Sequence, residues 1–184
     1  MSKVSGVILA GGLGSRMQGA NKALVLYRGK ALIQWVIDAL RPQVDELAIS
    51  LHAPSDVFSA FGLPLLFDCS QRMGPLGGVL GALQQSASAR TLFAPCDAPL
   101  LPPDLRKRLQ SAVPSYAQTD DGPQPCCCFI DRARLPATWA QTDTRSMQQW
   151  LASIGASAVQ FPDSQAFMNI NSLSDLESIN VLDA

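Results

Sequence analysis

The residues best suited to chemistry stand between positions 9 and 22, directly after a short apolar run. Val4 to Leu9 is typical of a strand that is buried on both faces. The segment after it contains three glycines and two cations: Gly11, Gly12, Gly14, Arg16 and Lys22. A glycine backbone can curl around an anion and direct several N–H groups at it, and both cations lie within reach of that anion. The segment therefore predicts a phosphate-binding loop.

Two common phosphate-binding motifs do not fit this loop. The dinucleotide fingerprint G-x-G-x-x-G requires a third glycine at position 17, where Met17 stands. The P-loop pattern G-x-x-x-x-G-K-[ST] matches Gly14 and Gly19, but Ala20 and Asn21 follow instead of Lys-Ser or Lys-Thr. The loop must belong to another class of phosphate site.

Polar side chains also follow other strand-like runs of the chain. Ser50, Asp68 and Asp97 each stand at or just after the end of such a run. Ligands of open α/β sheets gather beyond the carboxyl ends of the strands, so we expect these side chains to share one edge with the glycine loop. A single carboxylate beside a triphosphate is a usual protein ligand of Mg²⁺, which makes Asp97 the candidate metal ligand. Asp68 could instead form an Asx turn.

Strand-like and helix-like segments alternate along the chain. Strands are expected at 4–9, 47–51, 64–67, 91–94, 126–130 and 158–161, with a short extended piece at 23–26 and an exposed hairpin at 116–124. Helices are expected at 32–40, after Ser55, from 75, from 102, at 147–154, and after a Ser172–Asp175 capping box. This alternation predicts a mainly parallel sheet with helices on both faces, in one domain spanning residues 1–184.

Composition narrows the possible partners and the compartment. The 184 residues are 47% hydrophobic and 16% charged, which favours a folded α/β protein, and the net charge of −1 gives no support for nucleic-acid binding. No segment approaches the ~20 apolar residues of a membrane span, so we expect no membrane partner. Five cysteines without a C-x-x-C pattern, and one histidine, argue against a zinc site and favour a reduced, cytoplasmic protein.

The ordered set of motifs resembles the molybdenum cofactor guanylyltransferases. Leu9-Ala10-Gly11-Gly12, Arg16-Met17 and Lys22 follow the pattern L-A-G-G-x-x-x-R-M-G-x-x-K, with Gln18-Gly19 in place of the single glycine. The segment from Pro95 to Pro99 resembles P-C-D-x-P in the same family. The resemblance implies a nucleotidyltransferase with a Rossmann-like three-layer sandwich and a mostly parallel sheet.

The resemblance also assigns roles to individual residues. It implies catalytic roles for Arg16, Lys22 and Asp97, with Asp97 binding Mg²⁺. The implied nucleotide contacts are Leu9, Ala10, Gly11, Gly12, Lys22, Ser50, Asp68 and Asp97. The implied pterin contacts are Gly74 and Gly78 of a G-P-L-x-G segment, Arg145, and Asn169 and Asn171 of an F-x-N-x-N segment. Asn171 could bind either metal or pterin, and Ser50 departs from the asparagine of many relatives.

The implied reaction joins GMP from Mg·GTP to molybdenum-molybdopterin and releases pyrophosphate. Molybdoenzymes and cofactor-delivery proteins are candidate further partners. A cytidylyltransferase for the same pterin and a sugar-phosphate nucleotidyltransferase are alternatives, although Gly12 favours guanine in the resemblance. A non-catalytic nucleotide-binding or cofactor-binding chaperone is a second alternative. The presence of both Lys22 and Asp97 favours an enzyme over that chaperone.

Overall fold

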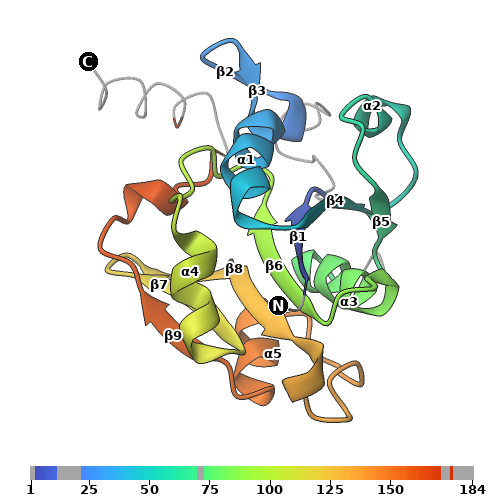
Figure 1. The fold of residues 1–184 in the computed structure, drawn as a ribbon, viewed down its shortest axis with the longest axis vertical. Helices are drawn as coiled ribbons and strands as arrows, with labels where there is room; N and C mark the ends of the chain where they lie inside the picture. Colours follow the sequence, from blue (N-terminus) through green and yellow to red (C-terminus); the bar gives the residue numbers. More distant parts are fainter. Residues whose placement is uncertain (1–2, 12–21, 70–72, 171–174, 176–184) are drawn as a thin grey trace.

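A seven-stranded sheet runs through the computed structural model, which describes residues 3–11, 22–69, 73–170 and 175 (Figure 1). The strand order is β5-β4-β1-β6-β8-β7-β9, and only β8 runs antiparallel to its neighbours. The strands are β1 (Val4–Leu9), β4 (Glu46–Leu51), β5 (Leu65–Phe67), β6 (Arg90–Pro95), β7 (Ser115–Thr119), β8 (Gly122–Asp131) and β9 (Ser157–Gln160). The predicted mostly parallel sheet is confirmed.

Five α-helices connect these strands in the described part of the chain. They are α1 (Leu32–Leu40), α2 (Asp56–Ser59), α3 (Pro75–Gln85), α4 (Leu105–Leu109) and α5 (Met147–Ser153). Short 3₁₀ turns lie at Lys22–Leu24, Arg41–Gln43, Gln110–Ala112, Arg132–Arg134 and Gln165–Phe167. A small hairpin, β2 (Leu26–Tyr27) and β3 (Lys30–Ala31), turns at Arg28 and Gly29, whose φ angles of 50° and 75° suit a two-residue hairpin loop.

Both faces of the sheet are buried, as the apolar run of β1 predicts. Val4 and Ile8 point into a core that includes buried residues of α1 and α4, whereas Val7 and Leu9 point into a second core with α3 and α5. Successive strand residues face opposite sides of a sheet, so one strand can supply both cores. The predicted three-layer α/β sandwich is confirmed (Figure 1).

Two local predictions differ from the structure. The extended piece expected at 23–26 begins instead as the 3₁₀ turn Lys22–Leu24. The hairpin expected at 116–124 is present, between β7 and the start of β8, but β7 is not exposed, because Ser115, Ala117 and Thr119 are buried. β7 is buried because β9 pairs with it on the side away from β8. The polar sequence of β7 does not predict this pairing. The capping residue Ser172 lies outside the described residues.

The five cysteines are all free thiols. Cys127 and Cys128 are buried, and burial raises the pKa of both thiols far above the ordinary value, so they pack as small apolar side chains. Burial likewise raises the pKa of Cys126 to about 12. Among the described helices, none combines the length and apolar character that a membrane crossing requires.

Helix α3 approaches the end of β5 so closely that glycine is required. A Cβ on Gly81 would lie 2.3 Å from the carbonyl oxygen of Phe67 and 2.8 Å from the amide nitrogen of Cys69. The Cys69 amide also donates a 3.2 Å hydrogen bond to the carbonyl of Gly77 in the helix. This backbone-to-backbone approach explains why α3 contains a glycine at position 81, although glycine weakens an isolated helix.

Replacing Gly81 by alanine should destabilise the fold. The added methyl group collides with backbone atoms that cannot rotate away, and overpacking of this kind costs about 1–3 kcal/mol of unfolding free energy, even after the better helix propensity of alanine is counted. Urea unfolding measures the change. Gln84→Ala on the exposed face of the same helix is the control and should leave stability nearly unchanged. A Gly81→Ala protein as stable as the original chain would contradict the close approach.

Candidate functional site

The carboxyl ends of four parallel strands form one continuous edge. Backbone hydrogen bonds extend the ladder past the strands: Ala10 donates to Ser50 at 2.9 Å, Asp68 donates to Leu51 at 3.0 Å, and Cys96 donates to Leu9 at 3.1 Å. The residues just beyond β5, β4, β1 and β6 are therefore held in register. The predicted gathering of Gly11, Ser50, Asp68 and Asp97 at this edge is confirmed.

A lysine and an aspartate form an ion pair beside β1 and β6. Lys22 Nζ contacts Asp97 Oδ2, and the two side chains are 23% and 13% exposed. Lys22 begins the 3₁₀ turn that follows the glycine segment, while Asp97 lies in the turn directly after β6. Because both groups are partly desolvated, their charges are less screened than those of a surface pair. Phosphates or a metal ion bound here would meet a strong local field.

A second polar cluster lies at the ends of β4 and β5. Ser50 Oγ donates to Asp68 Oδ1 at 3.2 Å, and His52 Nδ1 forms an ion pair with Asp68 Oδ2. The Asp68 side chain is 2% exposed, whereas that of His52 is 16% exposed. Burial raises the pKa of the Asp68 carboxyl, an effect opposed by the charge of His52 and the hydrogen bond from Ser50. Asp68 is thus engaged by protein groups on both oxygens.

Two glycines make room for this cluster. A Cβ on Gly11 would lie 3.0 Å from Asp68 Oδ2 and 3.2 Å from His52 Nδ1. A Cβ on Gly78 would lie 2.9 Å from Ser50 Oγ. The first glycine of the phosphate loop and the first turns of α3 therefore both pack directly on the cluster. Gly78, which the resemblance assigns to the pterin, lies on this side of the edge.

Sequence reasoning missed His52 as a site residue. It treated the histidine only as evidence against a zinc site. The available signal was its position: His52 stands directly after β4, which ends at Leu51, and two residues beyond Ser50. The contact with Asp68 further depends on β4 and β5 being paired neighbours.

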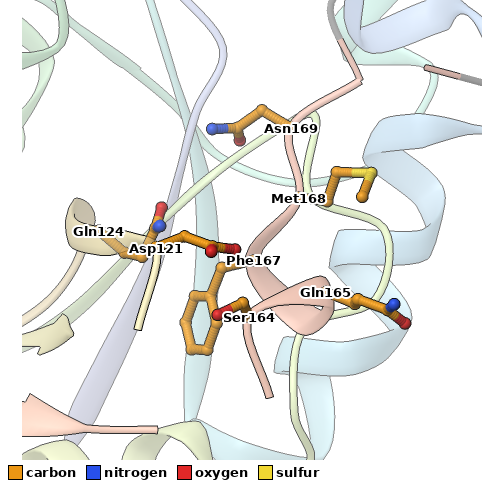
Figure 2. Close-up of a pocket in the computed structure, with 7 residues that line it drawn as sticks. All are labelled: Asp121, Gln124, Ser164, Gln165, Phe167, Met168 and Asn169. Carbon is orange, nitrogen blue, oxygen red and sulfur yellow. The ribbon is translucent and has the colours of Figure 1, made fainter. Parts of the chain in front are cut away.

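A pocket of about 280 Å³ lies between the β7–β8 hairpin and the segment 164–169. It is lined by Asp121, Gln124, Ser164, Gln165, Phe167, Met168 and Asn169. Figure 2 shows Asp121 and Gln124, from the turn and start of the β7–β8 hairpin, facing the late segment that carries Asn169. The amide of Ile170 donates a 3.0 Å hydrogen bond to the carbonyl of Asp97, so the segment that carries Asn169 runs beside the backbone of Asp97.

The remaining predicted site residues are less closely joined to these groups. Leu9 ends β1 and Gly74 precedes α3 with a φ of 55°. Arg145 is exposed ahead of α5, and no hydrogen bond or ion pair among the described residues connects it with Lys22, Asp97 or Asn169. Gly12, Arg16 and Asn171 lie outside the described residues. Their roles stay predictions.

The donor set suits a hard cation bound together with phosphates. No group of three His, Cys, Asp or Glu side chains is close enough to hold a metal ion within the described ranges. Mg²⁺ does not need such a cage, because it retains waters and takes most other ligands from substrate phosphates. The Asp97 carboxylate fits that requirement.

A three-layer fold with a glycine segment, a lysine and a carboxylate at one strand edge defines a nucleotidyltransferase. Residues 6–159 match the family of the MobA-like NTP transferase domain. The chain belongs to this family. It is 36% identical over 185 residues to the molybdenum cofactor guanylyltransferase of Mannheimia succiniciproducens, covering 95% of this chain and 97% of that protein. It is 34% identical to the protein of the same name from Ralstonia nicotianae, covering 97% and 96%.

Solved structures show the same fold. Molybdopterin-guanine dinucleotide biosynthesis protein A from Archaeoglobus fulgidus superposes with a TM-score of 0.76 at 21% identity, covering 97% of this chain and 98% of that one. A Mycobacterium tuberculosis protein in complex with manganese superposes with a TM-score of 0.69 at 15% identity, covering 100% and 99%. A protein with this fold therefore accommodates a divalent metal.

The raised pKa of Asp68 predicts a pH-dependent stability difference. Ionising this carboxyl costs the folded state more than the unfolded state, so stability is lost as the pH rises from 3.8, the ordinary aspartate value, to the raised value. Asp68→Asn abolishes that loss. Its unfolding free energy relative to the original chain should rise across this window, in urea titrations at successive pH values. The exposed Asp104→Asn is the control, and a difference for Asp68→Asn that stays constant or falls would contradict the burial effect.

Proposed function

We propose that this protein transfers GMP from Mg·GTP to the terminal phosphate of molybdenum-molybdopterin, giving the guanine dinucleotide form of the cofactor and pyrophosphate. The observation that carries the proposal is the Lys22–Asp97 ion pair. It lies between a nucleotide-side cluster around Asp68 and a pocket at Asn169, as a group-transfer centre between two substrates must. The names of the curated relatives supply the two substrates.

The proposed chemistry needs no covalent protein residue. An oxygen of the pterin phosphate forms a bond to the α-phosphorus of GTP, while the bond from that phosphorus to the bridging oxygen breaks and pyrophosphate leaves with the electron pair. Lys22 moves from Asp97 to the phosphates and neutralises the charge that accumulates on them. Arg16 and the backbone N–H groups around Gly11 and Gly12 are proposed to hold the remaining phosphate oxygens.

Asp97 is the proposed ligand of Mg²⁺. When bound, the ion would withdraw charge from the α- and β-phosphates and align them. The carboxylate already faces Lys22, so the place that the cation would take is one where positive charge is favourable. Leu9, Ala10, Ser50 and Asp68 complete the proposed nucleotide side.

The pocket beside Asp97 is the proposed site of the pterin substrate. Asn169 and Gln124 offer amides, and Phe167 offers an aromatic surface for a ring system. Asn171, Arg145 and Gly74 remain proposed pterin contacts from the family pattern. Gly78 fits the nucleotide side better, because it packs on Ser50 and Asp68.

We also propose that residues 1–184 form one domain in a reducing, cytoplasmic setting. The Ile170–Asp97 hydrogen bond brings the late segment back to the first half of the sheet, which supports a single unit. Five free thiols support a reducing compartment.

Pyrophosphate release with each nucleoside triphosphate in turn tests the function. We expect release only when molybdenum-loaded pterin is present, and with GTP preferred over ATP and CTP by about 30-fold or more, because a wrong base leaves roughly two buried polar groups unpaired. The control reaction omits the pterin. Equal use of CTP and GTP would refute guanylyl transfer while leaving nucleotidyl transfer in place.

Replacing Asp97 by asparagine should abolish most turnover. The substitution preserves shape but removes the charge that would hold Mg²⁺, so kcat should fall on the order of 10²–10³-fold, as when other transition-state electrostatic groups are lost. Asp104→Asn is the matched control, because it makes the same chemical change at an exposed aspartate directly before α4. This variant should retain turnover. Near-normal turnover of a folded Asp97→Asn protein would remove Asp97 from the metal site.

A further inference from the structure

The turn of the β7–β8 hairpin carries two adjacent aspartates that the protein uses differently. Asp120 accepts a 2.9 Å hydrogen bond from Gln160 Nε2, so its carboxylate is held by β9. Asp121 is exposed, and within residues 3–11, 22–69, 73–170 and 175 its carboxylate takes part in no hydrogen bond or ion pair. Figure 2 shows Asp121 at the pocket, which it lines together with Gln124. Both carboxylate oxygens of Asp121 are therefore available to a ligand in this pocket.

The other polar groups of the pocket are uncharged. Its seven lining residues contribute one carboxylate and no lysine, arginine or histidine. The side-chain amide of Gln124 has no hydrogen-bond partner in the part of the chain that the structure describes, so it offers one acceptor and two donors. A phosphate in this pocket would be repelled by Asp121 without meeting a cation. A neutral group that presents N–H donors would instead form charge-assisted hydrogen bonds with the carboxylate.

The size and place of the pocket indicate which part of a substrate it can hold. Its volume of about 280 Å³ is just below the ~300–1,000 Å³ of pockets that enclose a whole drug-sized ligand. The pocket therefore suits one ring system of a larger substrate. The wall at 164–169 continues to Ile170, whose amide donates to the carbonyl of Asp97. This wall thus leads from the pocket to the Lys22–Asp97 ion pair, where the phosphate of the same substrate would react.

We propose that Asp121 recognises the pterin ring of the acceptor substrate, and that its two carboxylate oxygens accept hydrogen bonds from the ring N–H and the neighbouring 2-amino group. Two N–H groups side by side on a planar ring match the two oxygens of a carboxylate, and paired charge-assisted bonds of this kind combine strength with specificity. This inference rests on the proposed function for the identity of the acceptor. It assigns ring recognition to the β7–β8 turn, outside the glycine loop and the other family motifs.

Guanine presents the same pair of donors as the pterin ring, so the base of GTP is the alternative ligand. The sheet topology favours the pterin. Ser50 and Asp68, which are proposed nucleotide contacts, follow β4 and β5, whereas the hairpin that carries Asp121 lies on the opposite side of β6 in the strand order. None of the seven residues that line the pocket is a proposed nucleotide contact. The base and the pterin ring would then occupy separate places on either side of Asp97.

Replacing Asp121 by asparagine tests the proposal in steady-state assays. The substitution keeps the size of the side chain but exchanges one acceptor oxygen for an N–H₂ group, which opposes the donors of the ring. We expect KM for molybdenum-molybdopterin to rise on the order of tenfold, with KM for GTP and kcat little changed. Asp121→Glu retains the carboxylate and should lose less affinity than Asp121→Asn.

Asp120→Asn is the matched control, because it makes the same chemical change at the neighbouring aspartate, which is held by Gln160. It should leave both KM values unchanged. An unaltered KM for the pterin substrate in Asp121→Asn, or an equal rise in Asp120→Asn, would overturn the proposal. Urea unfolding of Asp121→Asn should match that of the original chain, since the exposed carboxylate has no hydrogen bond or ion pair to lose in the described residues. A higher KM then reports recognition and not a folding defect.

Free ring compounds separate the two sources of the donor pair and need no turnover. Lumazine (2,4-dioxopteridine) differs from pterin by an oxygen in place of the 2-amino group. In equilibrium dialysis we expect the original chain to bind pterin more tightly than lumazine, and Asp121→Asn to lose most of that preference, because a wrong partner leaves a polar group unpaired. Guanosine affinity should not change. A loss for guanosine with pterin unaffected would assign the pocket to the nucleotide base and overturn the inference.

The ring titrations also distinguish failure of this inference from failure of the proposed function. If the original chain does not transfer GMP to the molybdenum-loaded pterin, guanylyl transfer fails, and the preference for pterin over lumazine still decides the role of Asp121. If transfer proceeds but Asp121→Asn keeps the KM values and the ring preference of the original chain, the function stands and the role of Asp121 is refuted.

Discussion

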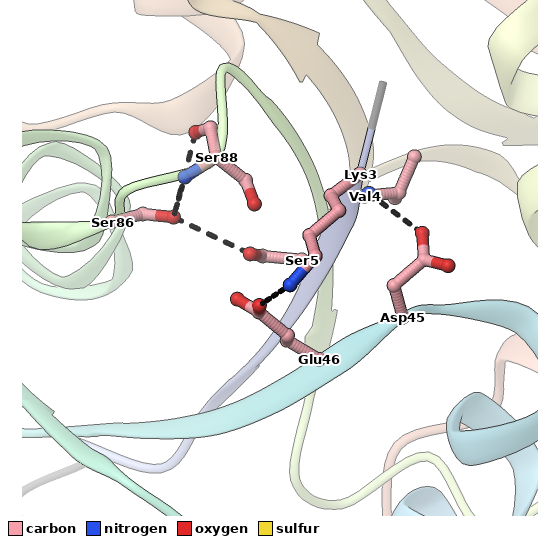
Figure 3. A network of polar contacts seen from close by, with 7 residues as sticks. All are labelled: Lys3, Val4, Ser5, Asp45, Glu46, Ser86 and Ser88. Carbon is pink, nitrogen blue, oxygen red and sulfur yellow. Dashed lines mark hydrogen bonds and ion pairs between the residues drawn. The ribbon is translucent and has the colours of Figure 1, made fainter. Parts of the chain in front are cut away.

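The whole site depends on four parallel strands that end at the same level. Backbone hydrogen bonds from Ala10, Asp68 and Cys96 carry the ladder one residue past the strands, so the side chains that follow inherit the regularity of the sheet. Other polar contacts join β1 and β4 at their amino ends. Figure 3 shows Lys3 paired with Glu46 at 2.9 Å and the amide of Val4 donating to Asp45 at 2.8 Å. With β1 held at both ends, the loop after it starts from a fixed point.

The site concentrates charges where burial makes them costly. The side chain of Asp68 is almost fully buried. Its pKa is raised because His52 and Ser50 do not fully offset the cost of removing the carboxylate from water. Lys22 and Asp97 are also partly withdrawn from water. Apolar residues at these positions would be easier to bury. The arrangement is understandable if it exists to bind and orient polar substrates, because functional sites commonly retain groups that lower stability.

Much of the fold follows from local sequence patterns. The apolar run Val4–Leu9 predicts a doubly buried strand, and Pro75 with the leucines after it predicts α3. Residues that end strands predict the site edge, which is why Asp68 and Asp97 could be placed from sequence. The His52–Asp68 pair could not, because it requires knowing that β5 pairs with β4. The burial of β7 was equally hidden, since its outer partner β9 lies about forty residues later and pairs in parallel.

The Asp97–Ile170 hydrogen bond joins two separate stretches of the chain at the candidate site. The proposed nucleotide contacts all come from residues 9–97, whereas the walls of the neighbouring pocket come from residues 121–169. These two stretches can therefore diverge independently. Under the proposed function, exchange of the β7–β8 turn and the 164–169 segment would alter the acceptor site and leave the proposed nucleotide contacts in place. In this proposal the fold keeps one nucleotide-donor site, and evolution or engineering can combine it with different acceptor-binding segments.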